Sequence, residues 1–154
     1  MKQEEILQQV KDGRLSIEEA STLLKGIEDI GYAAIDLSRQ KRNGFPEIIY
    51  GEGKNIEQLI GIITAMNEHK TAILATRVNA EKGEALSLAF PEGVYEPLGR
   101  TFVLNPIAPK HEHYIAVVTA GTSDIPVAEE AAVTAETFGN HVKRIYDVGV
   151  AGIH

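Results

Sequence analysis

The sequence contains no cysteine in its 154 residues. That absence excludes a disulfide framework, a zinc–thiolate site and a cysteine nucleophile within this chain. No apolar run approaches the roughly 20 residues that a membrane-spanning helix needs. The first residues, Met-Lys-Gln-Glu-Glu, are acidic and polar where a secretory signal is basic and then apolar. These absences predict a soluble, cytoplasmic protein.

Positive charge is also scarce. Fifteen Lys and Arg residues stand against 22 Asp and Glu residues, so the formal net charge is 15 − 22 = −7. Nucleic-acid binding normally depends on clustered cations that neutralise phosphates, so this composition disfavours it. The 44% of hydrophobic and 24% of charged residues are typical of a globular protein. The length is sufficient for one domain with a real core, or for a small domain with an appendage.

The chain predicts an α/β protein that begins with a helical hairpin. Residues 2–26 carry apolar residues at helical spacing, and Ser16 stands three positions before Glu19, as in a capping box. Nothing in this hairpin is catalytic, so we interpret it as a packing or docking appendage. The segments that follow are predicted as strands 32–37 and 46–50, a helix 56–69 capped by Asn55, a strand 71–76, hairpins or a long excursion over 79–100, a strand 101–104 and a linker 105–110.

The last part of the chain predicts one β–α–β unit. Residues 114–119 form a continuous apolar strand of the kind that is buried on both faces of a parallel sheet. A helix over 126–138 and a strand over 142–148 follow it. Because parallel sheets normally have more than two strands, we expect the chain to be the amino-terminal fragment of a longer protein.

The strongest site signal is Gly121-Thr122-Ser123-Asp124, between the end of that strand and the start of that helix. Ligands of open α/β sheets bind at such positions, where free N–H groups favour a phosphate. Asp124 suits a ribose hydroxyl or metal-held water. The alternative is that Ser123 or Asp124 simply caps the helix.

Two further segments carry cations. Gly51-x-Gly53-Lys54 lies between a strand and a helix, but Ile48 and Asn55 stand where a Walker A loop needs Gly and Ser or Thr, which excludes an NTPase. An anion nest or an ordinary tight turn remains. A polar loop before the second predicted strand carries three cations. Together with Lys54 and one cation after the next strand, they are candidates for contacting a phosphorylated substrate. The alternative is that the loop is simply solvated. These additional cations are Arg39, Lys41, Arg42 and Arg77.

The histidines divide into two groups. His111 and His113 have no third ligand nearby, so they predict no metal site. His154 follows the final predicted strand, where a general acid or base could face a ligand at the Ser123–Asp124 turn. No Gly-x-Ser-x-Gly or His-Glu-x-x-His motif supports a serine or zinc hydrolase.

Long blocks of the sequence resemble the LarB family in order along the chain. They are Asp36-x-x-Arg39-x-x-Arg42-Asn-Gly-Phe-Pro-Glu-Ile-Ile-Tyr50-Gly-Glu-Gly-Lys54, Leu74-Ala-Thr-Arg77, Ala120-Gly-Thr-Ser-Asp124-Ile-Pro-Val-Ala-Glu-Glu-Ala and Tyr146-Asp-Val-Gly-Val-Ala-Gly-Ile-His154. LarB is the carboxylase/hydrolase of nickel-pincer nucleotide biosynthesis, which makes the cofactor of lactate racemase. The resemblance implies that nicotinic acid adenine dinucleotide is carboxylated with CO₂ or bicarbonate and its phosphoanhydride is hydrolysed. The products are pyridinium-3,5-biscarboxylic acid mononucleotide and AMP.

The carboxy-terminal domain of LarB proteins is similar to PurE, the aminoimidazole ribonucleotide carboxylase/mutase. That likeness implies a flavodoxin-like sheet, of which this chain holds the first βαβ unit, and a homo-oligomer, an octamer in PurE. Gly121, Ser123 and Asp124 match the phosphate and ribose loop of PurE, although this loop is one residue shorter, and His154 matches a catalytic-block histidine. LarB proteins use a cysteine from the missing part to attack the pyridinium ring, and this chain has none. The isolated chain is therefore expected to be inactive.

The resulting interpretation has three parts: a hairpin over 1–30, a LarB-type α+β domain over 31–110 and the start of a PurE-like domain over 111–154. No cofactor is expected to bind tightly, although Mg²⁺ could accompany the substrate phosphates. Two alternatives stay open: a PurE-like carboxylase that acts on aminoimidazole ribonucleotide, and a nucleotide-binding or assembly module without chemistry.

Overall fold

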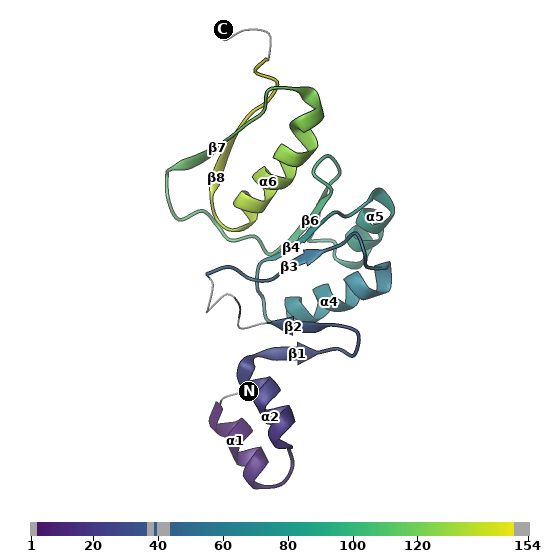
Figure 1. Cartoon of the computed structure of the whole chain (residues 1–154), viewed down its shortest axis with the longest axis vertical. Helices are drawn as coiled ribbons and strands as arrows, with labels where there is room; N and C mark the ends of the chain where they lie inside the picture. Colours follow the sequence, from purple (N-terminus) through teal and green to yellow (C-terminus); the bar gives the residue numbers. More distant parts are fainter. Residues whose placement is uncertain (1–2, 37–38, 40–43, 150–154) are drawn as a thin grey trace. The chain divides into compact units, whose positions relative to one another are not determined.

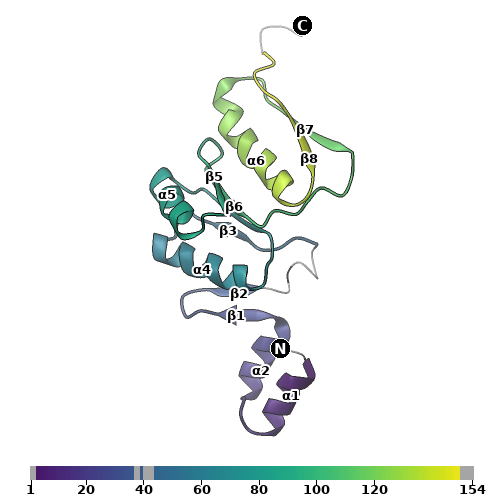
Figure 2. The ribbon, with the colours of Figure 1, turned by 180° about the vertical axis from the view of Figure 1, so that it is seen from behind.

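The computed structural model describes residues 3–36, 39 and 44–149 (Figures 1 and 2). By its internal contacts the chain divides into two compact units, Met1–Glu47 and Ile48–His154. Within the described ranges, no helix combines the length and apolar character that a membrane crossing requires. The mixed α/β class that the sequence predicts is confirmed.

The first unit contains a helical hairpin and a small antiparallel sheet. Helices α1 (Gln3–Lys11) and α2 (Ile17–Lys25) contact each other, and strands β1 (Ile27–Asp29) and β2 (Ala34–Asp36) pair with each other. The predicted capping box of α2 is confirmed. The Glu19 N–H donates to Ser16 Oγ at 3.1 Å, and the Ser16 N–H donates to the Glu19 carboxylate at 2.8 Å. Gly26 ends α2 with a φ of 69°, the left-handed conformation that favours glycine.

The second unit begins with a four-stranded mixed sheet in the order β3-β4-β6-β5. Strands β3 (Ile48–Tyr50) and β4 (Ile73–Thr76) are parallel and are joined through helix α4 (Ile56–Glu68). Strands β5 (Val94–Glu96) and β6 (Thr101–Leu104) complete the sheet by antiparallel pairing. The core of the unit lies on β4, where Ile73, Leu74 and Ala75 are fully buried.

The segment 79–100 differs from its prediction. It contains helix α5 (Ala80–Ala89), not hairpins alone, before β5 begins. Asn79 caps this helix by accepting a hydrogen bond from the Lys82 N–H at 3.0 Å. The helix has only a faint apolar stripe and carries Gly83 at its centre, so its sequence does not show helical periodicity. Gly83 is buried against the ring of Tyr95, which explains a glycine inside a helix.

The predicted β–α–β unit is present in the remaining residues. Strands β7 (Tyr114–Val118) and β8 (His141–Ile145) are parallel, and the 3₁₀ turn η1 (Thr122–Asp124) and helix α6 (Ile125–Thr137) lie between them. Helix α6 contacts β4 and β6, and Figures 1 and 2 show it on the side of the four-stranded sheet away from α4.

The expectation that β7 is buried on both faces is wrong for this structure. Tyr114, Ile115 and Val118 are exposed to 54%, 43% and 56%. The apolar run was read as a strand inside a wide sheet, whereas β7 pairs only with β8 and packs with α6. Burial of a strand depends on its neighbours, which the local sequence does not specify.

Candidate functional site

Cationic side chains gather where β3 and β4 end. We call this region the β3–β4 edge and define it as Tyr50–Asn55, Arg77–Lys82 and Arg100. The two strands are parallel neighbours, so their carboxyl ends meet at the same side of the sheet. The two helices that follow also begin here, and each is capped by a neutral asparagine, Asn55 or Asn79. Helix N-termini carry partial positive charge, so this edge favours anions.

Gly51 sets the geometry of the first loop. It is buried, and its N–H donates to the Thr76 carbonyl oxygen at 2.8 Å. A Cβ atom on Gly51 would lie 2.8 Å from that same oxygen, so a larger residue would push the two strand ends apart. The Lys54 N–H donates to the Gly51 carbonyl at 3.3 Å, which closes a tight turn. The glycine is thus required by the close approach of two backbones.

Two ammonium groups hold this turn. Lys54 Nζ donates to the Tyr50 carbonyl at 3.0 Å. Lys82 Nζ, from the first turn of α5, donates to the carbonyls of Gly51 at 2.9 Å and Glu52 at 3.2 Å. An ammonium group has three donors, so each lysine keeps at least one for a ligand.

The carboxylate of Glu52 lies among these cations. The Tyr50 hydroxyl donates a hydrogen bond to it. This bond, and then the nearby charges of Arg100, Arg77 and Lys82, hold the pKa of Glu52 below its ordinary value. The same hydrogen bond raises the pKa of Tyr50. At neutral pH the pair therefore consists of a neutral phenol and a carboxylate, and it presents a negative charge to the surrounding cations.

Arg77 connects the edge to α6. It has a positive φ of 55°, and its Nε atom lies 3.0 Å from a Glu130 carboxylate oxygen. The side chains of Arg77 and Glu130 are 42% and 24% exposed, so this ion pair contributes little to stability and can be exchanged for a ligand. Arg100 also has a positive φ, and its carbonyl accepts a hydrogen bond from the Val78 N–H at 2.8 Å.

The edge is locally positive in an acidic chain. Four cations, Lys54, Arg77, Lys82 and Arg100, stand against three carboxylates, those of Glu52 and Glu81 and that of Glu130 from α6, a formal balance of 4 − 3 = +1. The whole chain carries −7. Sequence reasoning identified Lys54 and Arg77 but missed Lys82, Arg100 and Glu52. No local motif marks them, because they join the cluster only after the strands and α5 have packed.

The Gly121–Asp124 turn leaves its side chains exposed. Asp124 is the N-cap residue of α6, yet its side chain makes no capping hydrogen bond, and its backbone is helical at φ −86° and ψ −14°. Thr122 and Ser123 are exposed as well. The N–H groups of Asp124 and Ile125 are used inside the turn, so an anion would meet the N–H groups and hydroxyls of Thr122 and Ser123.

An ion-pair network joins strand β8 to helix α6. The Arg144 guanidinium donates to Glu129 at 2.8–3.0 Å and to Glu136 at 2.6–2.7 Å. The Tyr146 hydroxyl donates to Glu129 at 2.8 Å. Arg144 above all holds the pKa of Glu129 below its ordinary value, while burial and the bond to Glu129 raise the pKa of Tyr146 to about 12. The network ties β8 and the residue after it to α6.

The other predicted site residues belong to neither the β3–β4 edge nor the Gly121–Asp124 turn, and some of them lie outside the described residues. Arg39 is exposed and belongs to the first unit. Arg42 and His154 lie outside the described residues. His111 and His113 are exposed, and the described residues contain no group of three or more potential metal ligands.

A comparison with models of protein families shows which family the chain belongs to. A family model described as the LarB/PurE-like N-terminal domain matches residues 27–106, which are 80 of the 154 residues. The chain belongs to the LarB family. The β3–β4 edge lies entirely within the matched residues of this LarB-family chain, whereas the helical hairpin and the Gly121–Asp124 turn lie outside them.

A relative of the chain extends the likeness over nearly all of it. The LarB-family chain is 32% identical to a protein of Methanocaldococcus jannaschii, uncharacterized protein MJ0165, in an alignment that covers 97% of this chain. The chain spans 62% of the length of that relative.

Proposed function

We propose that this chain supplies the nucleotide-binding amino-terminal part of a LarB-type enzyme. In the proposed reaction the enzyme carboxylates the pyridinium ring of nicotinic acid adenine dinucleotide with CO₂ or bicarbonate and hydrolyses the phosphoanhydride. The products are pyridinium-3,5-biscarboxylic acid mononucleotide and AMP. The single observation that carries this proposal is the cationic β3–β4 edge within the matched LarB domain.

The charge of the edge suits the proposed substrate. The dinucleotide carries two adjacent phosphates and a ring carboxylate, and charge-assisted hydrogen bonds to such groups are stronger than neutral ones. We assign Lys54 and Arg77 to this binding and add Lys82 and Arg100. Exchange of the partly buried Glu130 partner of Arg77 for a phosphate would keep the charge of Arg77 paired.

The remaining assignments are part of the same proposal. Gly121, Thr122, Ser123 and Asp124 would bind a second part of the nucleotide, a phosphate or a ribose hydroxyl, and His154 would act as a general acid or base. Arg39 and Arg42 would add electrostatic attraction for the substrate. Mg²⁺ would accompany the substrate phosphates and not occupy a site of its own.

This chain does not contain the nucleophile that the reaction needs. A pyridinium ring is electron-poor and attacks CO₂ only after a thiolate has added to it, and the chain has no cysteine. We therefore expect residues 1–154 alone to bind substrate without turnover. The full-length relative MJ0165, whose length the alignment with this chain covers to 62%, is the protein to compare with it in an activity assay.

The test is an assay with nicotinic acid adenine dinucleotide, bicarbonate and Mg²⁺ in which AMP and carboxylated mononucleotide are separated by chromatography. The proposal predicts both products from full-length MJ0165 and none above a blank from the 154-residue chain. AMP release by the short chain would contradict its assigned role. Carboxylation of aminoimidazole ribonucleotide by the longer protein, without the dinucleotide reaction, would favour the PurE-type alternative.

A further inference from the structure

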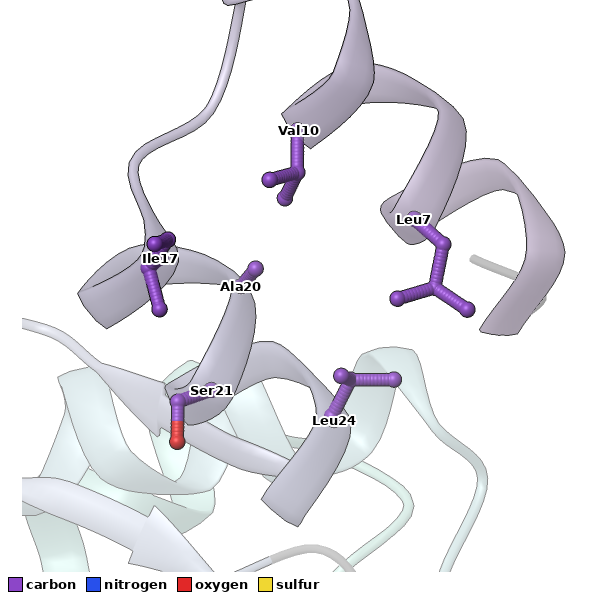
Figure 3. Close-up of a pocket in the computed structure, with 6 residues that line it drawn as sticks. All are labelled: Leu7, Val10, Ile17, Ala20, Ser21 and Leu24. Carbon is purple, nitrogen blue, oxygen red and sulfur yellow. The ribbon is translucent and has the colours of Figure 1, made fainter.

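The helical hairpin has an open apolar groove between its two helices. Figure 3 shows α1 and α2 facing each other across it, with small residues on the α2 side. The cavity measures about 320 Å³. Ile17 is 74% exposed and Leu7 is 52% exposed. The lining residues are Leu7, Val10, Ile17, Ala20, Ser21 and Leu24.

The hairpin is too small to bury these side chains by itself. Each helix has nine residues, and isolated helices shorter than about 12–15 residues are marginal in water. Among the described residues of the two helices, only Ile6 and Ala20 are buried hydrophobic residues. An apolar surface of this kind, rimmed by charged residues, marks an interaction surface.

The charges on α1 point to the partner. Glu4, Leu7 and Lys11 are spaced i, i+3 and i+7, so they lie in one row along the helix, and all three are exposed. The row has an acidic end, an apolar centre and a basic end. When two copies of such a row pack antiparallel, Leu7 meets Leu7 and Glu4 of each copy meets Lys11 of the other.

We propose that this groove is a self-association surface that binds the hairpin of a second copy of the chain. A two-fold axis near Leu7 relates the copies and places the two α1 helices antiparallel. The row of mixed charge complements itself, and it does not complement a uniformly acidic or basic partner. The hairpin precedes residues 27–106, so the surface lies outside the matched LarB domain.

The interface is small, so the dimer is expected to be weak. Interfaces that bury less than about 1,200 Å² in total are typical of weak or transient complexes. Sedimentation of the full 154-residue chain should therefore show a reversible monomer–dimer equilibrium. A chain that stays monomeric over the whole accessible concentration range would overturn the proposal.

The first variant tests the apolar contact. Leu7→Glu should weaken dimerisation by about tenfold or more, because it places an unpaired charge in the centre of the interface. Leu88→Glu is the matched control, since Leu88 is 83% exposed on α5. It should leave the dimer unchanged. A dimer that survives Leu7→Glu would place the contact elsewhere, for example on the exposed strand β7, and would overturn the proposal.

The second experiment tests the antiparallel arrangement and does not depend on a core change. Glu4→Lys and Lys11→Glu should each weaken self-association several-fold, because each creates like charges at both ends of the contact. An equimolar mixture of the two variants should restore the affinity, since opposite charges then meet at both ends. Circular dichroism checks that the helix content is unchanged. A mixture that associates no better than either variant alone would contradict the antiparallel pairing.

Discussion

At the scale of single residues, Arg144 of β8 pairs with two carboxylates of α6 that differ in exposure. The Glu129 side chain is 10% exposed and its carboxylate accepts from both Arg144 and Tyr146, while Glu136 is 39% exposed on the other arm of the guanidinium. Removing one partner of a buried pair leaves the other uncompensated, whereas an exposed pair contributes little. The two carboxylates of one arginine should therefore differ in their contribution to stability.

The first prediction concerns this difference and its pH dependence. Because the pKa of Glu129 is lowered in the folded state, its stabilisation is present above the ordinary value of 4.5 and is lost as the pH falls through the folded pKa. Glu129→Gln should lower the free energy of unfolding by about 1–3 kcal/mol at neutral pH and flatten its acid dependence. Glu136→Gln should cost less than about 1 kcal/mol. Urea titrations between neutral and acidic pH measure both. An unchanged acid dependence in Glu129→Gln would refute the assignment.

A second prediction at this scale concerns Asp124. Its carboxylate makes no capping hydrogen bond, so Asp124→Ala should change the free energy of unfolding by less than about 1 kcal/mol, the size of a helix-dipole effect. In the proposed enzyme the same substitution should weaken nucleotide binding by about 1–3 kcal/mol, because a charged hydrogen-bond partner is lost. Thermal unfolding and calorimetric titration separate the two. Unchanged affinity would leave Asp124 without a ligand role.

At the scale of the secondary-structure elements, the turn between β3 and α4 has no room for a side chain at Gly51 but has room for one at Gly53. Gly51 has no room for a Cβ atom beside the Thr76 carbonyl, whereas Gly53 has no atom within 4 Å of such a Cβ. Neither has a positive φ, so the comparison isolates steric contact from backbone conformation.

The third prediction follows from that contrast. Gly51→Ala should lower the free energy of unfolding by about 1–3 kcal/mol, because the two strand ends must separate to admit the methyl group. It should also weaken anion binding at the β3–β4 edge, since Lys54 and Lys82 both bond to this turn. Gly53→Ala should remain close to the unchanged chain in both measurements. Equal effects of the two substitutions would show that the turn does not depend on the close contact between Gly51 and the Thr76 carbonyl oxygen.

Local sequence signals predicted the elements whose ends are marked by caps. Asn55 caps α4 and Ser16 forms the capping box of α2, as the sequence predicts. The short strand β1 and the helix α5 were missed, because three residues give no periodicity and because Gly83 and a weak apolar stripe conceal the helix. The exposure of β7 also escaped prediction, since burial is a property of neighbouring strands and not of the strand itself.

At the scale of the whole molecule, an acidic chain concentrates positive charge at one edge of its larger unit. The contributing residues come from the ends of β3 and β4, the first turn of α5 and the start of β6, up to about fifty positions apart in the sequence. The pattern of cations in the sequence identified Lys54 and Arg77. The convergence of Lys82, Arg100 and Glu52 on them is a result of folding, and no spacing rule in the sequence predicts it.

At this scale we propose that the β3–β4 edge of this LarB-family chain binds a phosphate-bearing nucleotide. The most direct measurement is an NMR titration of the ¹⁵N-labelled 154-residue chain with nicotinic acid adenine dinucleotide at low and high salt. We expect saturable shifts of the amides of Gly51–Lys54, Arg77–Lys82 and Arg100, with weaker affinity at high salt. Shifts confined to other residues, or no shifts at low salt with the chain folded, would contradict it.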